Sequence, residues 1–181
     1  MRVAYADPPY LGMAARLYGD PTYDSLDAHR HLLRRMEMEY DAWAYSLHQP
    51  SLYLIQRVLE EDLGLHQLSG DYRVMAWVKP WCSFKPGVGV AYAWEPVIVR
   101  GGRRRTRRQD TVRDWVAANV TLRRGLAGAK PEQFFYWLFE VLNLRPDDEF
   151  HDLFPGTGAA TKAWERWRRQ ARLFVEEAQT G

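Results

Sequence analysis

The sequence has almost no residues that form disulfides: among its 181 residues, Cys82 is the only cysteine. A single cysteine forms no internal disulfide and no cysteine-based zinc site. Long hydrophobic runs are also missing, because no apolar segment reaches the roughly 18 residues that a membrane span requires. The N-terminal residues turn polar by Asp7, which leaves no room for a signal peptide, so we expect a cytoplasmic protein without a membrane anchor.

Lysine is scarce as well, since only four of the 25 basic residues are lysines and 21 are arginines. Six arginines fall within residues 100–108, and subtracting them from the formal net charge of +2 leaves −4 for the remaining chain. One concentrated positive segment is typical of a nucleic-acid contact, although a solvated arginine-rich loop fits the charge pattern equally well. The candidate nucleic-acid contacts are Arg103, Arg104, Arg105, Arg107 and Arg108.

Apolar spacing predicts both helices and strands along the chain. The expected helices cover residues 26–40, 50–63, 110–119, 131–142 and 159–170. The expected strands cover residues 3–6, 42–47, 72–78, 96–100, 149–154 and 172–175. Because the two kinds alternate, we expect a single α/β domain over residues 1–181, with a mainly parallel sheet and helices on both faces. Ligands bind such sheets at the carboxyl ends of strands.

The first unusual turn is Asp7-Pro8-Pro9-Tyr10, directly after an apolar strand. Two adjacent prolines fix the backbone and remove two N–H donors. The corner therefore offers only acceptors, the Asp7 carboxylate and the Pro8 carbonyl, which suit a ligand that brings donors, such as an exocyclic amino group. Tyr10 follows where its ring could stack on a planar base. A proline-rich turn with a capping aspartate is the alternative, and we favour a catalytic role for Asp7, Pro8, Pro9 and Tyr10.

The second unusual turn, at residues 152–158, carries two glycines between a strand and a helix. Such glycines let a ligand approach the backbone closely. Glu176 follows about twenty residues after the first glycine, the spacing of a ribose-binding acid in nucleotide folds, although a plain surface glutamate is an equal alternative. Thr161 replaces the third glycine of a dinucleotide fingerprint, so an adenosine-bearing ligand without a pyrophosphate fits better than NAD.

These two motifs in this order resemble the circularly permuted amino-methyltransferases of DNA. An Asp-Pro-Pro-Tyr strand end precedes an Asp-x-Phe-x-Gly-x-Gly strand end, as in that family. The resemblance extends to Lys130-Pro131, before the expected cofactor-side helix. Weaker similarities to phage-type and mRNA-type adenine methyltransferases lie at residues 77–79 and 94–97. The resemblance implies a Rossmann-like methyltransferase fold and S-adenosylmethionine (SAM) as cofactor.

The resemblance also implies roles for individual residues. Asp7 and the Pro8 carbonyl hold the target amino group, and Tyr10 stacks on the flipped base. An aspartate at the first position favours adenine N6 over cytosine N4. The residues implied to bind the cofactor are Lys130 near its carboxylate, Asp152 beside its amino-acid end, Glu176 on its ribose, and Phe154, Gly156 and Gly158 along its side.

The implied activity is methylation of adenine N6 in DNA, either site-specific or relaxed. Residues 101–129 are the only segment available for target contact, and they are rich in arginine rather than in groups that read base edges. Relaxed specificity or help from a second subunit, as in a homodimer, would account for this. Two alternatives stay open: a catalytically silent nucleic-acid-binding subunit, and an adenine methyltransferase that acts on RNA. His29 and His31 face different directions on an expected helix, so we expect no metal site.

Overall fold

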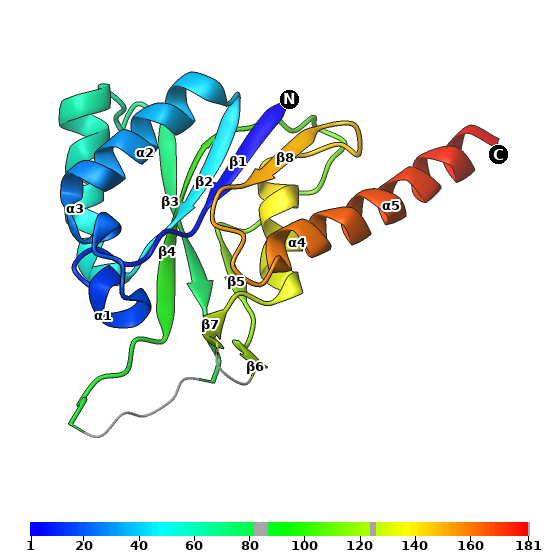
Figure 1. The fold of residues 1–181 in the computed structure, drawn as a ribbon. Coiled ribbons are helices and arrows are strands. Elements are labelled where there is room, and N and C mark those ends of the chain that lie inside the picture. Colours follow the sequence, from blue (N-terminus) through cyan, green and yellow to red (C-terminus); the bar gives the residue numbers. More distant parts are fainter. Residues whose placement is uncertain (82–86, 124–125, 181) are drawn as a thin grey trace.

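Six strands form a sheet in the order β5-β3-β4-β2-β1-β8 (Figure 1). The structure is a computed structural model that describes residues 1–81, 87–123 and 126–180, so Cys82 lies outside the described part. The strands of this sheet are β1 (Arg2–Ala6), β2 (Ala42–Ser46), β3 (Tyr72–Val78), β4 (Trp94–Gly101), β5 (Trp115–Ala117) and β8 (Glu149–Asp152). A separate hairpin consists of β6 (Thr121–Arg123) and β7 (Leu126–Ala129).

Five of the six strands run in the same direction, and β4 runs against them. β1 pairs in parallel with β2 and with β8, and β3 pairs in parallel with β5. β4 lies between β2 and β3 and is antiparallel to both. The expectation of a mainly parallel sheet is therefore confirmed. The carboxyl ends of the five parallel strands meet at one edge, which faces the lower part of Figure 1.

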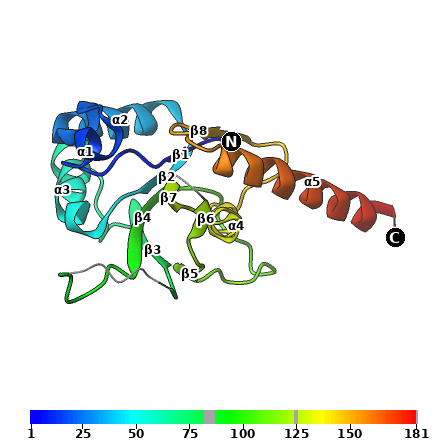
Figure 2. The ribbon, with the colours of Figure 1, turned by 60° about the horizontal axis from the view of Figure 1, so that its bottom comes forward.

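Helices cover both faces of the sheet, as the alternation of elements predicts (Figure 2). α2 and α3 lie on one face, whereas α4 and the first half of α5 lie on the other. The helices are α1 (Ala14–Tyr18), α2 (Leu26–Glu39), α3 (Leu52–Arg57, continued by a π-helical turn at Val58–Asp62), α4 (Glu132–Val141) and α5 (Ala159–Thr180), with 3-10 turns at Thr22–Asp24 and Gln49–Ser51. Within the described ranges, no helix combines the length and apolar character needed to cross a bilayer.

The two buried clusters follow from the alternation of side chains along the central strands. Trp43 and Tyr45 of β2 point to the α2–α3 side and pack with Leu33. Tyr5 of β1 points to the opposite side, where its ring meets the edge of Phe135 at a centroid distance of 5.4 Å. All five residues of β2 are buried, which is the pattern of a strand covered on both faces.

Two of the expected elements are wrong. Residues 110–119 do not form a helix, because Trp115–Ala117 is strand β5, and pairing with β3 outweighs the local helical pattern. The indole N–H of Trp77 also donates to the Ala118 carbonyl at 2.8 Å, which fixes the end of this strand. Residues 172–175 are not a strand but part of α5, since the arginine-, glutamate- and alanine-rich sequence continues the helix.

Candidate functional site

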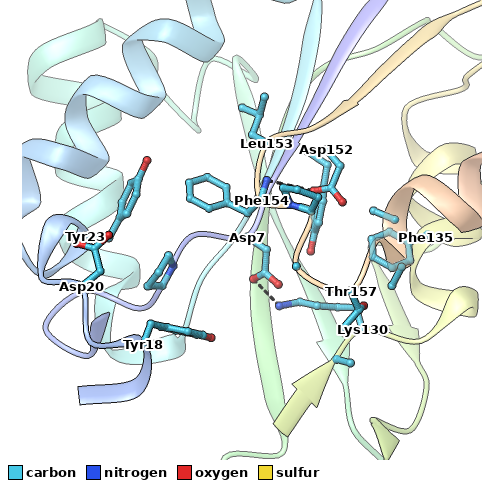
Figure 3. A pocket seen from close by; sticks show the side chains of 17 residues that line it. Asp7, Tyr18, Asp20, Tyr23, Lys130, Phe135, Asp152, Leu153, Phe154 and Thr157 are labelled. Atoms are coloured by element: carbon cyan, nitrogen blue, oxygen red, sulfur yellow. Dashed lines mark hydrogen bonds and ion pairs between the residues drawn. The ribbon is translucent and has the colours of Figure 1, made fainter. Parts of the chain in front are cut away.

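A cavity of about 520 Å³ opens at the carboxyl edge of the sheet, between the turns that follow β1 and β8 (Figure 3). These turns meet because β1 and β8 are parallel neighbours, with Tyr5 opposite Asp152. The volume falls within the roughly 300–1,000 Å³ range of small-molecule sites. The predicted site residues that line the cavity are Asp7, Pro9, Lys130, Asp152, Phe154 and Gly156.

An ion pair joins the first motif to the residue that precedes α4. Nζ of Lys130 donates to Oδ1 of Asp7 at 2.6 Å, and the Lys130 residue is only 6% exposed. Burial alone would lower the pKa of Lys130, but the negative charges of Asp7 and, to a smaller extent, Glu95 raise it well above its ordinary value. Lys130 is therefore a permanent cation that fixes one oxygen of Asp7 at the cavity wall.

Glu95, near the start of β4, extends this ion pair into a row of four alternating charges. Its Oε2 lies 3.4 Å from Lys130 Nζ, and its Oε1 accepts a hydrogen bond from Lys79. Both ammonium groups lie over the buried indole of Trp77, at 5.1 Å and 5.7 Å from its centroid. Burial raises the pKa of Glu95, but the positive charges of the two lysines lower it by more. Its pKa therefore lies below the ordinary value, and the carboxylate stays ionised. The formal charges cancel, which offsets much of the cost of burying them.

Pro8 and Tyr10 do not line this cavity but a smaller hollow beside it, which Pro9 shares. The ring of Tyr10 stacks on the imidazole of His48, with centroids 4.8 Å apart and planes 8° from parallel. Ser51 Oγ in turn lies 2.7 Å from His48 Nδ1 and orients the imidazole. Burial raises the pKa of Tyr10, so its hydroxyl stays neutral. One face of the Tyr10 ring is thus already covered within the protein.

The second turn places an acid beside the cavity and has two glycines in the left-handed backbone conformation. Gly156 and Gly158 have φ values of +43° and +70°, a left-handed conformation that side chains with a Cβ rarely adopt. Gly158 is not among the residues that line the cavity. Burial raises the pKa of Asp152 to about 6, the Phe154 N–H partly offsets this, and the nearby Asp7 charge adds to it. Asp152 is therefore a carboxylate that a bound cation would stabilise.

The opposite wall of the cavity consists of residues that the motifs did not indicate. Tyr18, Asp20 and Tyr23, from α1 and the segment after it, face the second turn (Figure 3). The edge of the Tyr23 ring contacts Phe154, with centroids 5.1 Å apart. In the sequence these residues form a polar, glycine- and proline-containing loop, which signals only a surface connection. The sequence indicates Glu95 more clearly than these three residues, because Glu95 is an acid inside an otherwise apolar strand.

Glu176 does not occupy the position that was expected of a ribose-binding acid. Because residues 172–175 belong to α5, no strand ends before it. It lies 17 positions after Ala159, which is roughly 26 Å along the helix axis at about 1.5 Å per residue. Figure 1 shows this half of α5 pointing away from the sheet. The strand-end geometry behind the prediction is absent, and the acid on the wall opposite Asp152 is Asp20.

The arginine cluster lies at the other edge of the sheet, because β4 carries the chain away from Asp7. Gly101 pairs with Ala42 at the amino end of β2. Arg103 is committed to an ion pair with the buried Asp148, whose Oδ1 also accepts from the Met1 amine at 2.7 Å. Arg105 is bound to the carbonyl and carboxylate of Glu140. The remaining cluster members are exposed and form no ion pair within the described residues: Arg104, Arg107 and Arg108.

No family model matches the sequence, and no curated protein matches it. The solved structures that match its fold include two of M1.HpyAVI. The crystal structure of the M1.HpyAVI–SAM complex has a TM-score of 0.59 and 13% sequence identity, covering 91% of this chain and 78% of that one. The crystal structure of M1.HpyAVI has a TM-score of 0.56 and 12% identity, covering 93% and 76%.

The chain therefore has a Rossmann-like α/β fold that resembles the fold of these two structures. This agreement confirms the expected Rossmann-like α/β fold class, whereas the circular permutation stays a prediction. It also explains the position of the cavity, because ligands of such sheets lie beyond the carboxyl ends of the strands.

Proposed function

We propose that this protein is a SAM-dependent methyltransferase that acts on the N6 amino group of adenine in DNA. One observation carries the proposal: a single cavity is lined both by Asp7 of the first turn and by Asp152, Phe154 and Gly156 of the second. The fold shared with M1.HpyAVI, one structure of which is a complex with SAM, supports it. The order of the two turns supports circular permutation of that fold.

The residues around the second turn fit SAM as cofactor. Asp152 suits the positive ammonium end, since its carboxylate is half-buried and burial raises its pKa to about 6, so a cation beside it would stabilise the charged form. The edge of Phe154 and the ring of Tyr23 offer apolar contacts for the adenine. Asp20 offers a carboxylate to hydroxyl groups from the opposite wall. When bound, SAM supplies a sulfonium methyl group to the target nitrogen.

The first turn would activate the target by accepting its protons. An exocyclic amino nitrogen is a poor nucleophile because its lone pair is delocalised into the ring. Asp7 and the Pro8 carbonyl accept its two hydrogens, which draws the nitrogen toward tetrahedral geometry and frees the lone pair. Lys130 holds Oδ1 of Asp7, so Oδ2 is the oxygen available for the amino hydrogen and for the proton released afterwards. Tyr10 would stack on a base taken out of the helix.

Incubation with methyl-labelled SAM tests this proposal. The purified protein is offered double-stranded DNA, single-stranded DNA and RNA, and the digested nucleosides are identified by mass spectrometry. We expect N6-methyladenine from DNA, and we expect Asp7→Ala to abolish it while SAM binding, measured by calorimetry, persists. Methylation of RNA but not of DNA would identify RNA as the substrate. Binding of nucleic acid without turnover on any substrate would show a catalytically silent subunit and overturn the proposal.

A further inference from the structure

The donors of Lys130 are more numerous than its protein partners. An ammonium group carries three N–H donors. One is used by Asp7 Oδ1 at 2.6 Å, and Glu95 Oε2 lies 3.4 Å from the same nitrogen as an ion-pair partner without a hydrogen bond. Lys130 also lines the cavity directly, next to Asp7 (Figure 3). One donor is therefore left at the cavity wall beside the free oxygen of Asp7.

We propose that Asp7 and Lys130 together read the amidine edge of the target base, with Asp7 accepting from its amino group and Lys130 donating to the adjacent ring nitrogen. This inference rests on the proposed function and assigns the specificity of that site. In adenine the amino nitrogen and the ring nitrogen N1 are separated by one carbon atom. They present a donor next to an acceptor, which complements a carboxylate paired with an ammonium. Lys130 thus serves substrate recognition in addition to holding Asp7.

The same geometry rejects bases with the opposite pattern. Guanine, thymine and uracil present a carbonyl oxygen where adenine has its amino group, and that oxygen would face the Asp7 carboxylate. They also present an N–H where adenine has N1, and that hydrogen would face the Lys130 ammonium. A mismatched pair leaves both protein charges without partners in a buried site, which is costly. Cytosine matches the pattern, so these two residues select amino bases as a class.

Glu95 positions Lys130 for this role. Its residue is 7% exposed, and its Oε2 has no hydrogen bond within the described part of the chain. The nearest cation to that oxygen is Lys130 Nζ, while the other oxygen is held by Lys79. Glu95 therefore places a second negative charge beside the ammonium group, in addition to that of Asp7. The two charges hold Lys130 Nζ at the cavity wall.

Base analogues test the inference on the enzyme itself. Single-stranded oligonucleotides carry adenine, 1-deazaadenine or 7-deazaadenine at every adenine position, and kcat/KM for methyl transfer is measured. We expect 1-deazaadenine, which lacks the N1 acceptor, to react roughly ten- to a hundredfold more slowly than adenine, because a hydrogen bond to a charged donor is lost. We expect 7-deazaadenine, which keeps N1, to react like adenine. Equal rates on adenine and 1-deazaadenine would overturn the inference.

Variants separate the N1 contact from the altered chemistry of the analogue. Lys130→Met keeps the length of the side chain without its donors, so we expect it to react equally with adenine and 1-deazaadenine at a lower rate. Lys79→Met removes the other ammonium of the row and should keep the preference for adenine. If Lys130→Met does not fold, Lys130→Arg retains a donor and should retain the preference. Persistence of the full preference in Lys130→Met overturns the inference, whereas no methylation of ordinary adenine by the wild type refutes the proposed function instead.

Discussion

Nζ of Lys130 lies 2.6 Å from Oδ1 of Asp7, although the two residues are 123 positions apart in the sequence. Both residues line the cavity, and the pair joins the turn after β1 to the segment before α4. Both partners are held in place by the protein before any ligand binds. The site is therefore preorganised, with one carboxylate oxygen fixed and the other turned to the cavity.

Removal of this buried cation should destabilise the fold. Lys130→Met leaves Asp7 with no cation and Glu95 with only Lys79, and breaking a buried pair costs about 3–5 kcal/mol. Urea unfolding monitored by tryptophan fluorescence measures the change. The matched control is Arg57→Met, which breaks the exposed Arg57–Glu61 pair and should cost less than about 1 kcal/mol. Addition of Asp7→Asn to Lys130→Met should recover part of the loss, and a purely additive double variant would contradict the pairing.

Asp152 should make the empty site less stable at neutral pH than at acidic pH. Its folded pKa of about 6 is higher than the unfolded value, so its contribution is present at low pH and is lost as the pH rises through 6. Asp152→Asn should therefore raise the free energy of unfolding at pH 8 by on the order of 1 kcal/mol after solvent screening, and change it little at pH 4. Thermal unfolding across this pH range checks the prediction, and the same variant should bind SAM more weakly at pH 8.

Arg103 should matter for stability, whereas its neighbour Arg104 should not. Burial would raise the pKa of Asp148, but hydrogen bonds from Arg103, the Met1 amine and the Arg145 N–H lower it to about 2. The resulting stability, about 2 kcal/mol, is present above pH 4 and is lost as the pH falls through 2. We expect Arg103→Gln to lose a similar amount at pH 7 and Arg104→Gln to lose less than about 0.5 kcal/mol. Similar effects of the two changes would refute the assignment.

The exposed arginines should account for salt-dependent binding if the cluster contacts nucleic acid. Substitution of Arg104, Arg107 and Arg108 by glutamine removes three charges without touching the Asp148 ion pair. If each contacts a phosphate, the negative slope of log K against log salt should become shallower by about 2.7 in the triple variant. Fluorescence anisotropy with a labelled oligonucleotide at several salt concentrations measures the slope. An unchanged slope would show that the cluster is a solvated loop.

The elements that build the site were predictable from short-range patterns. The strand at residues 72–78 and the helix beginning at Leu26 agree with the structure, because apolar alternation and a Ser25 cap define them locally. The two turns around Asp7 and Gly156 were predictable because proline and glycine constrain the backbone directly. Such signals need no knowledge of distant partners.

The partners of individual charges were not predictable in the same way. Nothing near Lys130 in the sequence indicates Asp7 or Glu95, since these contacts depend on how the end of β1, the start of β4 and the end of β7 come together. The arginine run looks uniform, yet Arg100, Arg103 and Arg105 are bound by acids on α2, before β8 and on α4. Residues 115–117 became a strand because β3 offered an open edge, which is a tertiary effect.

The reversal of β4 sends its two ends to opposite poles of the molecule. Glu95 stands at the pole where the cavity opens, and the arginine run begins at Arg100 near the other pole, roughly 17 Å away along five residue steps of about 3.3 Å. Binding of a long nucleic acid and modification of one of its bases would then take place at separate sites. An oligonucleotide too short to reach from one pole to the other would contact only the cavity. The affinity for a substrate would then depend on its chain length.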